Sequence, residues 1–89
     1  YLFHDIFTML SAYVLIEAEA GKERQILEAL NSNESVVDVS IVYGQYDIIA
    51  KVFLNDMIDL PTFIMETIRP IKGITETSTL LAAYDPLNA

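Results

Sequence analysis

Apolar and polar residues partly alternate from Ala12 to Glu19, and β-branched residues are frequent there, which predicts a first strand. One face of this strand carries small and aliphatic side chains along its whole length. The opposite face begins apolar, with Tyr13 and Leu15, and ends polar, with Glu17 and Glu19. Both faces of the first half therefore favour burial, whereas the helices of a two-layer monomer cover only one face of a sheet. The pattern indicates that another subunit covers the second face.

Two segments have apolar residues at helical spacing. The first is residues 21–31. Its apolar stripe consists of Ile26, Leu27 and Leu30. The second helix begins near Asp59, because Pro61 is compatible only with the first turn of a helix. It ends where Pro70 and Gly73 follow its last apolar residues. The side chains available to cap its N-terminus are Asn55, Asp56 and Asp59.

Three further segments have the composition of strands, and they are residues 36–44, 46–54 and 74–84. The first two of these are so close in sequence that they must form an antiparallel hairpin, turning at Gly44 and Gln45. The resulting order, βαββαβ, predicts an α+β, ferredoxin-like fold with an antiparallel four-stranded sheet and two helices on one face. We assign residues 11–84 to this domain, residues 1–10 to an N-terminal extension and residues 85–89 to a C-terminal tail.

Length and composition limit the class of protein. A chain of 89 residues forms one domain with one small core, and without cysteine it has neither disulfides nor thiolate metal sites to support that core. It is 53% hydrophobic and 20% charged, which is apolar for so small a body and indicates apolar surface between subunits. The net charge of -8 opposes direct binding of nucleic acid, since that affinity comes largely from Lys and Arg.

The chain contains no apolar run of the roughly 18 to 20 residues that a membrane helix needs. Its opening, YLFHDIFTML, lacks the positively charged start and the small-residue cleavage site of a secretory signal. We therefore expect a cytoplasmic protein that does not interact with membranes.

Candidates for catalysis are few. His4 is the only histidine, and we expect it to be an incidental surface or interface residue. Glu17 and Glu19 share a strand face and could act as a paired acid and base, but solvated strand ends explain them better. The sequence has no phosphate-binding loop, no G-x-G-x-x-G and no cluster of metal ligands. We therefore expect no catalytic site, no metal and no cofactor.

The sequence GQYD, residues 44–47, is the best candidate for a binding site. A turn explains Gly44, which permits positive φ, and it explains Asp47 if the carboxylate accepts backbone N–H bonds. It does not explain why a carboxylate lies at the edge of the apolar face that continues with Ile49 and Phe53. A small zwitterion needs a carboxylate for its ammonium, donors for its own carboxylate and an apolar pocket. Hydroxyl donors are available from Thr75, Thr77, Ser78 and Thr79, although threonine is also simply a good strand residue.

From about Ser11 to Ala83 the chain resembles the effector-binding domain of the Lrp/AsnC (feast/famine) transcriptional regulators. The resemblance rests on AYVLIEAEAGKERQILEALNSNESVVDVSIVYGQYDIIAKV and on the later GITETSTLLA. In that family a G-x-Y/F-D motif at a strand end leads into an apolar strand, and a later helix ends in P/K-G-I/V before T-x-T. The matching residues here are Gly44, Tyr46 and Asp47, then Lys72, Gly73 and Ile74, then Thr77 and Thr79.

The resemblance implies a ferredoxin-like unit whose open sheet face pairs with another subunit, and dimers that assemble into octamers or decamers. It also implies an amino acid or a similar small effector bound between dimers, near the two motifs. The ligand-binding residues expected on this basis are Tyr43, Gly44, Gln45, Tyr46, Asp47, Thr75, Thr77, Ser78 and Thr79. Typical members also carry an N-terminal helix-turn-helix, whereas here only residues 1–10 precede the domain. The chain is thus similar to a stand-alone effector domain, which we expect to act by ligand-dependent assembly or by pairing with full-length regulators rather than by direct DNA binding.

We therefore expect a non-enzymatic, oligomeric sensor of amino acids that acts in transcriptional regulation. Two alternatives stay open. A ligand-free oligomeric scaffold would have its pocket near Gly44 and Thr77 closed by Tyr46 or Gln45. A small ferredoxin-like dimeric enzyme, of the monooxygenase or isomerase type, would need a buried polar cluster between sheet and helices, for which the sequence offers no suitably placed His, Trp or Arg.

Overall fold

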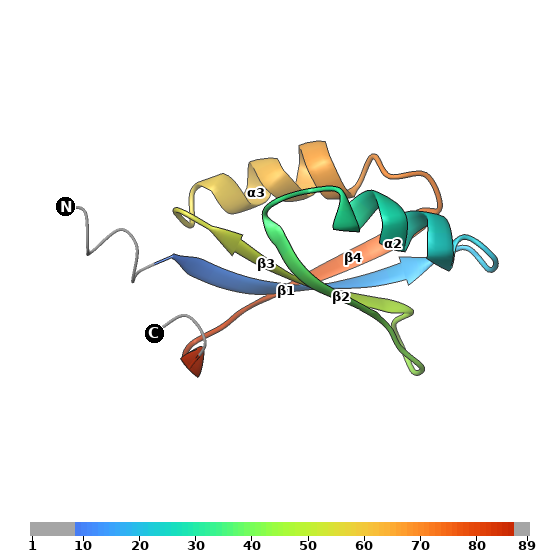
Figure 1. Cartoon of the computed structure of the whole chain (residues 1–89), viewed down its shortest axis with the longest axis horizontal. Helices are drawn as coiled ribbons and strands as arrows, with labels where there is room; N and C mark the ends of the chain where they lie inside the picture. Colours follow the sequence, from blue (N-terminus) through green and yellow to red (C-terminus); the bar gives the residue numbers. More distant parts are fainter. Residues whose placement is uncertain (1–8, 87–89) are drawn as a thin grey trace.

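The computed structural model describes residues 9–86, which form a four-stranded antiparallel sheet with the helical segments on one face (Figure 1). The strands are β1 (Leu10–Ala18), β2 (Val36–Ile41), β3 (Ile48–Leu54) and β4 (Ile74–Leu81). The helical segments are α2 (Glu23–Asn31), α3 (Asp59–Phe63) and η1 (Ile64–Ile68). The strand order β2-β3-β1-β4 confirms the predicted ferredoxin-like α+β fold. His4, most of the N-terminal extension and the last three residues of the tail lie outside the described residues.

The core lies between the sheet and the helical layer, and it follows the alternation in the two central strands. In β1 the alternate residues Ala12, Val14 and Ile16 are fully buried, and β3 repeats the same period. From the helical layer, the fully buried side chains are Ile26, Leu30 and Ile68. The predicted stripe of the first helix is thus confirmed at Ile26 and Leu30, whereas Leu27 is only half-buried.

The ends of the elements differ from the prediction. β1 begins and ends slightly earlier than expected, α2 begins at Glu23 rather than at residue 21, and β4 ends at Leu81 rather than at residue 84. The antiparallel hairpin of β2 and β3 is confirmed, with Ile41 paired to Ile48. Its loop is longer than predicted, because residues 42–47 lie between the strands and the Val42 N–H donates to the Asp47 carbonyl at 2.9 Å.

The second helix begins near Asp59 with Pro61 in its first turn, as predicted, and of the predicted caps the Asp56 carboxylate accepts a backbone N–H, that of Ile58 at 3.5 Å. Its N-cap position is Ile58, which carries no capping hydrogen bond, and the Asp56 carbonyl accepts the Asp59 N–H at 3.1 Å instead. The helix also widens from α3 into the π-helical turn η1, where the Arg69 N–H donates to the Ile64 carbonyl at 2.8 Å.

Candidate functional site

Asp47 lies directly before β3, and hydrogen bonds join it to β1. Its N–H donates to the Ile16 carbonyl at 2.9 Å, and its Oδ2 accepts the Ala18 N–H at 2.8 Å. The carboxylate therefore stabilises the end of β1 where the pairing with β4 shifts register, between Glu17 and Ala18. It does accept a backbone N–H, as the turn interpretation requires, but the donor belongs to β1 rather than to the loop. The other oxygen, Oδ1, accepts no hydrogen bond from residues 9–86.

A hollow of about 430 Å³ opens beside Asp47, between the β2–β3 loop and the start of α2. The residues that line it are Gly21, Glu23, Arg24, Ile41, Val42, Tyr43 and Asp47. Two carboxylates and one guanidinium therefore border the same space, beside the apolar side chains of β2 and the loop. Such a lining suits a ligand that carries an ammonium, a carboxylate and a short apolar part.

Arg24 is the residue of this hollow that the sequence did not single out, although it offers a better partner for a ligand carboxylate than a hydroxyl does. It reaches the site because the connection from β1 to α2 lies at the same end of the sheet as the β2–β3 loop (Figure 1). The sequence does place Gly21 and Arg24 just after the first strand, in a connection that could line a site. Assigning them to the Asp47 site requires knowing that the fold brings this connection next to the β2–β3 loop.

The hydroxyl side chains of β4 are divided between the two faces of the sheet. Thr77 lies opposite Ile16, on the face that the helices cover, and Thr79 continues on that face. Ser78, between them, lies on the open face. Ser78 thus does not point into one common space with Thr77 and Thr79.

The structure does not bring β4 to Asp47 within one chain, because β1 lies between β3 and β4. Asp47 and Thr77 flank Ile16 from opposite sides, two strand spacings or about 10 Å apart. Thr75 uses its hydroxyl to donate to the Glu17 carbonyl at 3.1 Å. None of the four β4 hydroxyls lines the hollow beside Asp47.

The loop residues that the scaffold alternative requires do not fill this hollow. Gln45 is exposed and Tyr46 half-buried, and neither lines it, whereas Tyr43 is fully exposed at its edge. Gly44 has a φ of +135°, in the region that favours glycine. The space beside Asp47 is therefore open in the single chain.

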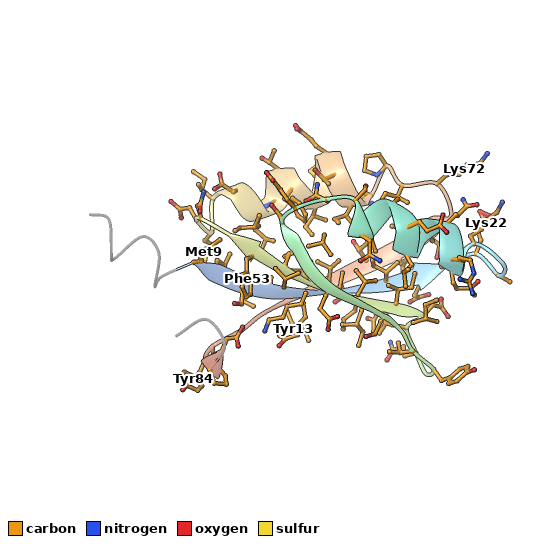
Figure 2. All side chains as sticks on the ribbon, in the orientation of Figure 1. Met9, Tyr13, Lys22, Phe53, Lys72 and Tyr84 are labelled. Atoms are coloured by element: carbon orange, nitrogen blue, oxygen red, sulfur yellow. The ribbon has the colours of Figure 1, made fainter. Side chains whose placement is uncertain are left out.

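The face of the sheet away from the helices is apolar around one lysine. Tyr13 lies on this face, below the sheet in Figure 2, and Leu15, Ile49 and Phe53 share it; all four side chains are half-buried in the single chain. The centre of the face is occupied by Lys51. We call this surface, made of Tyr13, Leu15, Ile49, Lys51 and Phe53, the open face.

Lys51 is paired with a residue that the sequence assigned to the C-terminal tail. Its Nζ lies 2.7 Å from the Asp85 Oδ2, and the two side chains are only 12% and 8% exposed. The hydrogen bond with Asp85 raises the pKa of Lys51, although partial burial opposes this. The ammonium also lies 5.6 Å and 5.4 Å from the ring centroids of Tyr13 and Phe53. Asp85 thus belongs structurally to the domain.

Between the sheet and the helices, the described residues 9–86 form no polar cluster of the kind that the enzyme alternative requires. Ser11 is the one polar residue that is buried in the region from Met9 to Pro86. Within the same region, no three His, Asp or Glu side chains are grouped to hold a metal ion. None of the helices described is long and apolar enough to cross a membrane.

Comparison with known proteins agrees with this geometry. The family model described as the Lrp/AsnC ligand binding domain matches residues 11–85. An uncharacterised HTH-type transcriptional regulator of Pyrococcus abyssi is 38% identical over 68 residues, which are 76% of this chain and 43% of that protein. The crystal structure of FFRP-DM1 matches with a TM-score of 0.80 and 42% identity over 83% of this chain and 99% of that one. A hypothetical protein from Pyrococcus horikoshii matches with a TM-score of 0.79 and 40% identity over 88% and 94%.

The family match extends over most of the described chain and spans the GQYD loop and the β4 motif. The chain spans less than half the length of the Pyrococcus abyssi regulator, and nearly all of the two solved chains. The relatives with assigned names are transcriptional regulators rather than enzymes. The chain therefore belongs to the Lrp/AsnC family and corresponds to its ligand-binding domain.

Proposed function

We propose that this chain senses amino acids through the hollow beside Asp47 and acts in transcriptional regulation by ligand-dependent assembly. The observation that carries the proposal is that Asp47 and Arg24, which have opposite charges, line one space of about 430 Å³. An α-amino acid presents the complementary charges on a single carbon atom. Its ammonium pairs with the Asp47 Oδ1 and its carboxylate with the Arg24 guanidinium.

The apolar part of the hollow suits the side chain of such a ligand. Ile41 and Val42 contribute aliphatic surface, and Tyr43 stands fully exposed at the edge. Glu23 adds a second carboxylate, so the lining is acidic overall and favours the ammonium end of a ligand. If the ligand lies between subunits, a hydroxyl from β4 of another copy completes the site. Thr77 or Ser78 would then bind the ligand, although neither lines the hollow of its own chain.

The open face supports the assembly part of the proposal. Half-buried Tyr13, Leu15, Ile49 and Phe53 form an apolar surface that a second copy would cover. A ligand that contacts one assembly more favourably than another shifts the population by the difference in affinity. Pairing through the same face with a full-length regulator would transmit the signal to DNA, which this acidic chain does not bind directly.

Calorimetric titration of the purified protein with each of the twenty amino acids, with sedimentation velocity in parallel, tests the proposal. We expect heat from at least one amino acid, together with a change in the distribution of oligomers. Arg24→Gln should weaken that binding about tenfold, as expected for losing a charge-assisted hydrogen bond worth roughly 1.4 kcal/mol. Asp47→Asn should do the same while keeping an oxygen acceptor for the Ala18 N–H.

Arg69→Gln is the matched control, because Arg69 is exposed and lies outside the hollow. It changes the net charge as Arg24→Gln does and should leave binding unchanged. If no amino acid gives heat and the oligomer distribution does not change, the proposal is refuted. An assembly that forms without any response to ligand would instead identify a scaffold.

A further inference from the structure

The segment that follows β4, residues 82–86, lies on the side of the sheet away from the helices (Figure 1). Ala82 still continues the pairing with β1, because its N–H donates to the Ser11 carbonyl at 3.0 Å. Three positions later, the Asp85 carboxylate lies 2.7 Å from the Lys51 Nζ, at the centre of the open face. We call residues 82–86 the C-terminal segment.

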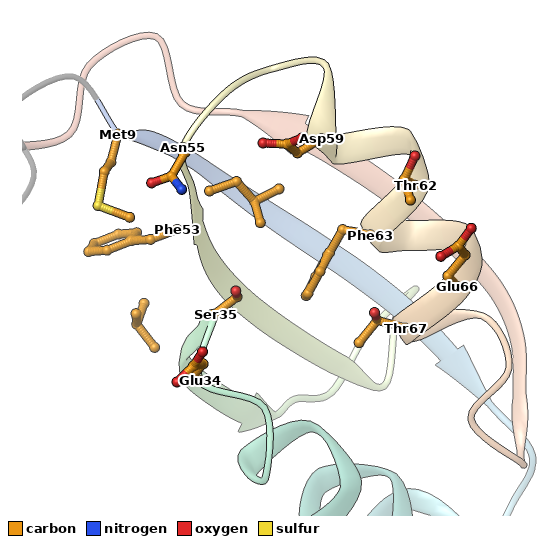
Figure 3. A pocket seen from close by; sticks show the side chains of 12 residues that line it. Met9, Glu34, Ser35, Phe53, Asn55, Asp59, Thr62, Phe63, Glu66 and Thr67 are labelled. Carbon is orange, nitrogen blue, oxygen red and sulfur yellow. The ribbon is translucent and has the colours of Figure 1, made fainter. Parts of the chain in front are cut away.

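The chain itself covers the end of the open face that this segment reaches. Ser11 lies opposite Phe53 in the register of β1 and β3 and so belongs to this side of the sheet, yet it is only 4% exposed. Met9 lies beside the Phe53 ring at the same end (Figure 3). Leu15 and Ile49, which are paired with each other, lie toward the other end of the face and are only half-buried. The open face therefore has one covered end and one end that the C-terminal segment leaves open.

The C-terminal segment buries its charged residue and exposes its aromatic one. Tyr84 is 75% exposed, whereas the carboxylate of the next residue, Asp85, is almost fully buried. Figure 2 shows Tyr84 below the sheet, on the same side as Tyr13. Leu80, which lies opposite Tyr13 in β4, is exposed as well. A buried charge beside an exposed ring is the reverse of the usual distribution, and contiguous exposed apolar surface of this kind marks a contact with another protein.

The Lys51–Asp85 pair determines where Tyr84 lies. Much of the attraction in a buried ion pair is offset by the cost of removing both charges from water, and fixing one arrangement of the chain is its best-attested role. Here the ion pair and the Ala82 hydrogen bond hold the segment on either side of Tyr84. The ring is therefore presented in one place, so that little conformational entropy is lost when it docks.

The charge of the open face favours a second copy of this chain as the partner. In a twofold contact identical surfaces meet, so a residue at the centre of the face lies close to the same residue of the other copy. Two unneutralised Lys51 ammonium groups would repel each other there, and the pair with Asp85 removes this repulsion within each chain. With a net charge of -8 on each chain, two copies also repel each other less at this neutral, apolar face than at an acidic surface.

We propose that the C-terminal segment is part of the contact between two copies of this chain, with the Tyr84 ring of each copy packed against Leu15 and Ile49 of the other. The inference rests on the assembly through the open face that is proposed above. A twofold axis that runs across the strands brings the covered end of each face to the open end of the other. Asp85 is a positioning residue in this contact, because it acts through Tyr84.

The absence of tryptophan from the sequence allows a direct test on the intact protein. Tyr84→Trp introduces a single indole, and Ile58→Trp is the matched control, since Ile58 is 77% exposed and lies at the start of α3 in the helical layer. Sedimentation velocity follows pairing as the protein concentration rises. Over that range we expect the fluorescence of Tyr84→Trp to shift to shorter wavelength, and that of Ile58→Trp to stay unchanged. Pairing without a shift in Tyr84→Trp would overturn the proposal.

Sedimentation equilibrium without ligand gives the dissociation constant of the pair. Tyr84→Ser should raise this Kd about tenfold or more, because each pair loses two rings, whereas Ile58→Ser should leave it unchanged. Asp85→Asn should raise it about fivefold, because the ring is no longer held in place. Adding Tyr84→Ser to Asp85→Asn should then have little further effect, and additive losses would show that Asp85 does not position Tyr84.

The outcomes separate this inference from the assembly on which it rests. If Ile49→Asp dissociates the pair and Tyr84→Ser does not, the open face is an interface to which the C-terminal segment does not belong, and the inference is overturned alone. A wild-type protein that stays monomeric at every concentration would overturn the inference together with the proposed assembly.

Discussion

Replacing Gly73 with alanine should destabilise the domain much more than the same change at Gly21. Both glycines have positive φ, +102° at Gly73 and +87° at Gly21. Each replacement therefore introduces backbone strain of about 1 to 2 kcal/mol, offset by roughly 0.4 to 1 kcal/mol from the loss of freedom in the unfolded chain. The two replacements differ in the atoms that the added Cβ would contact.

At Gly21 the added Cβ has no atom within 4 Å, whereas at Gly73 it lies 2.7 Å from the Lys22 Cβ and 3.3 Å from the Ile26 Cδ1. Neither neighbour can move easily. The Lys22 Cβ is fixed to its backbone, and Ile26 is fully buried. The chain at Gly73 is itself held in place, because its carbonyl accepts the Glu19 N–H at 2.8 Å. Lys22 and Lys72, on either side of this contact, lie together at one end of the molecule (Figure 2).

Overpacking of this kind costs about 1 to 3 kcal/mol. The expected loss of unfolding free energy is thus about 0 to 1.6 kcal/mol for Gly21→Ala and about 1 to 4.6 kcal/mol for Gly73→Ala, with the overpacking of about 1 to 3 kcal/mol as the difference between them. The larger figure is a substantial part of the stability of a domain of this size. Urea unfolding followed by circular dichroism, at one fixed protomer concentration, measures both variants. Equal destabilisation by the two would refute the steric argument.

Three further predictions concern Asp47 and the open face of the sheet. Asp47→Ala should lower the unfolding free energy by about 1 to 3 kcal/mol in urea titrations, because the Ala18 N–H loses its acceptor. Ile49→Asp should dissociate any assembly that forms through the open face, and retention of the oligomer in sedimentation velocity would count against that surface. Since Asp85 raises the pKa of Lys51 above its ordinary 10.5, the pair stabilises the fold below pH 10.5 and ceases to do so as pH rises through the raised pKa. The difference in urea midpoint between wild type and Asp85→Asn should therefore be constant from neutral pH to pH 10.5 and shrink above it.

The fold could be predicted because its central strands and its first helix follow simple periods. Ile16 and Ile26 are buried where a period of two and a period of 3.6 place them. The length of the β2–β3 loop could not be predicted, because Tyr43 and Tyr46 favour strands but have no ladder partner beyond Ile41. The π-turn has no sequence signal that we recognise.

The candidate site was predictable only in part, for a physical reason. Asp47 is marked by its position beside a turn and an apolar strand, which is local information. Its hydrogen bond to Ala18 spans 29 positions, and Arg24 reaches the same hollow only through the packing of α2. The contact of Asp85 with Lys51 likewise joins distant segments. Chemistry that depends on neighbours in space rather than in sequence becomes visible only once the fold is known.

The Lys51–Asp85 pair bears on how selective the open face is. Asp85 of the same chain already neutralises Lys51. A partner that packs against the open face therefore does not need an acidic residue opposite this lysine. The selection of one partner over another then depends on shape complementarity, above all at the rings of Tyr13 and Phe53 beside the ammonium. If another copy packs against this face, a domain with different side chains at the positions of Tyr13 and Phe53 would fit it less well, even with the same charges.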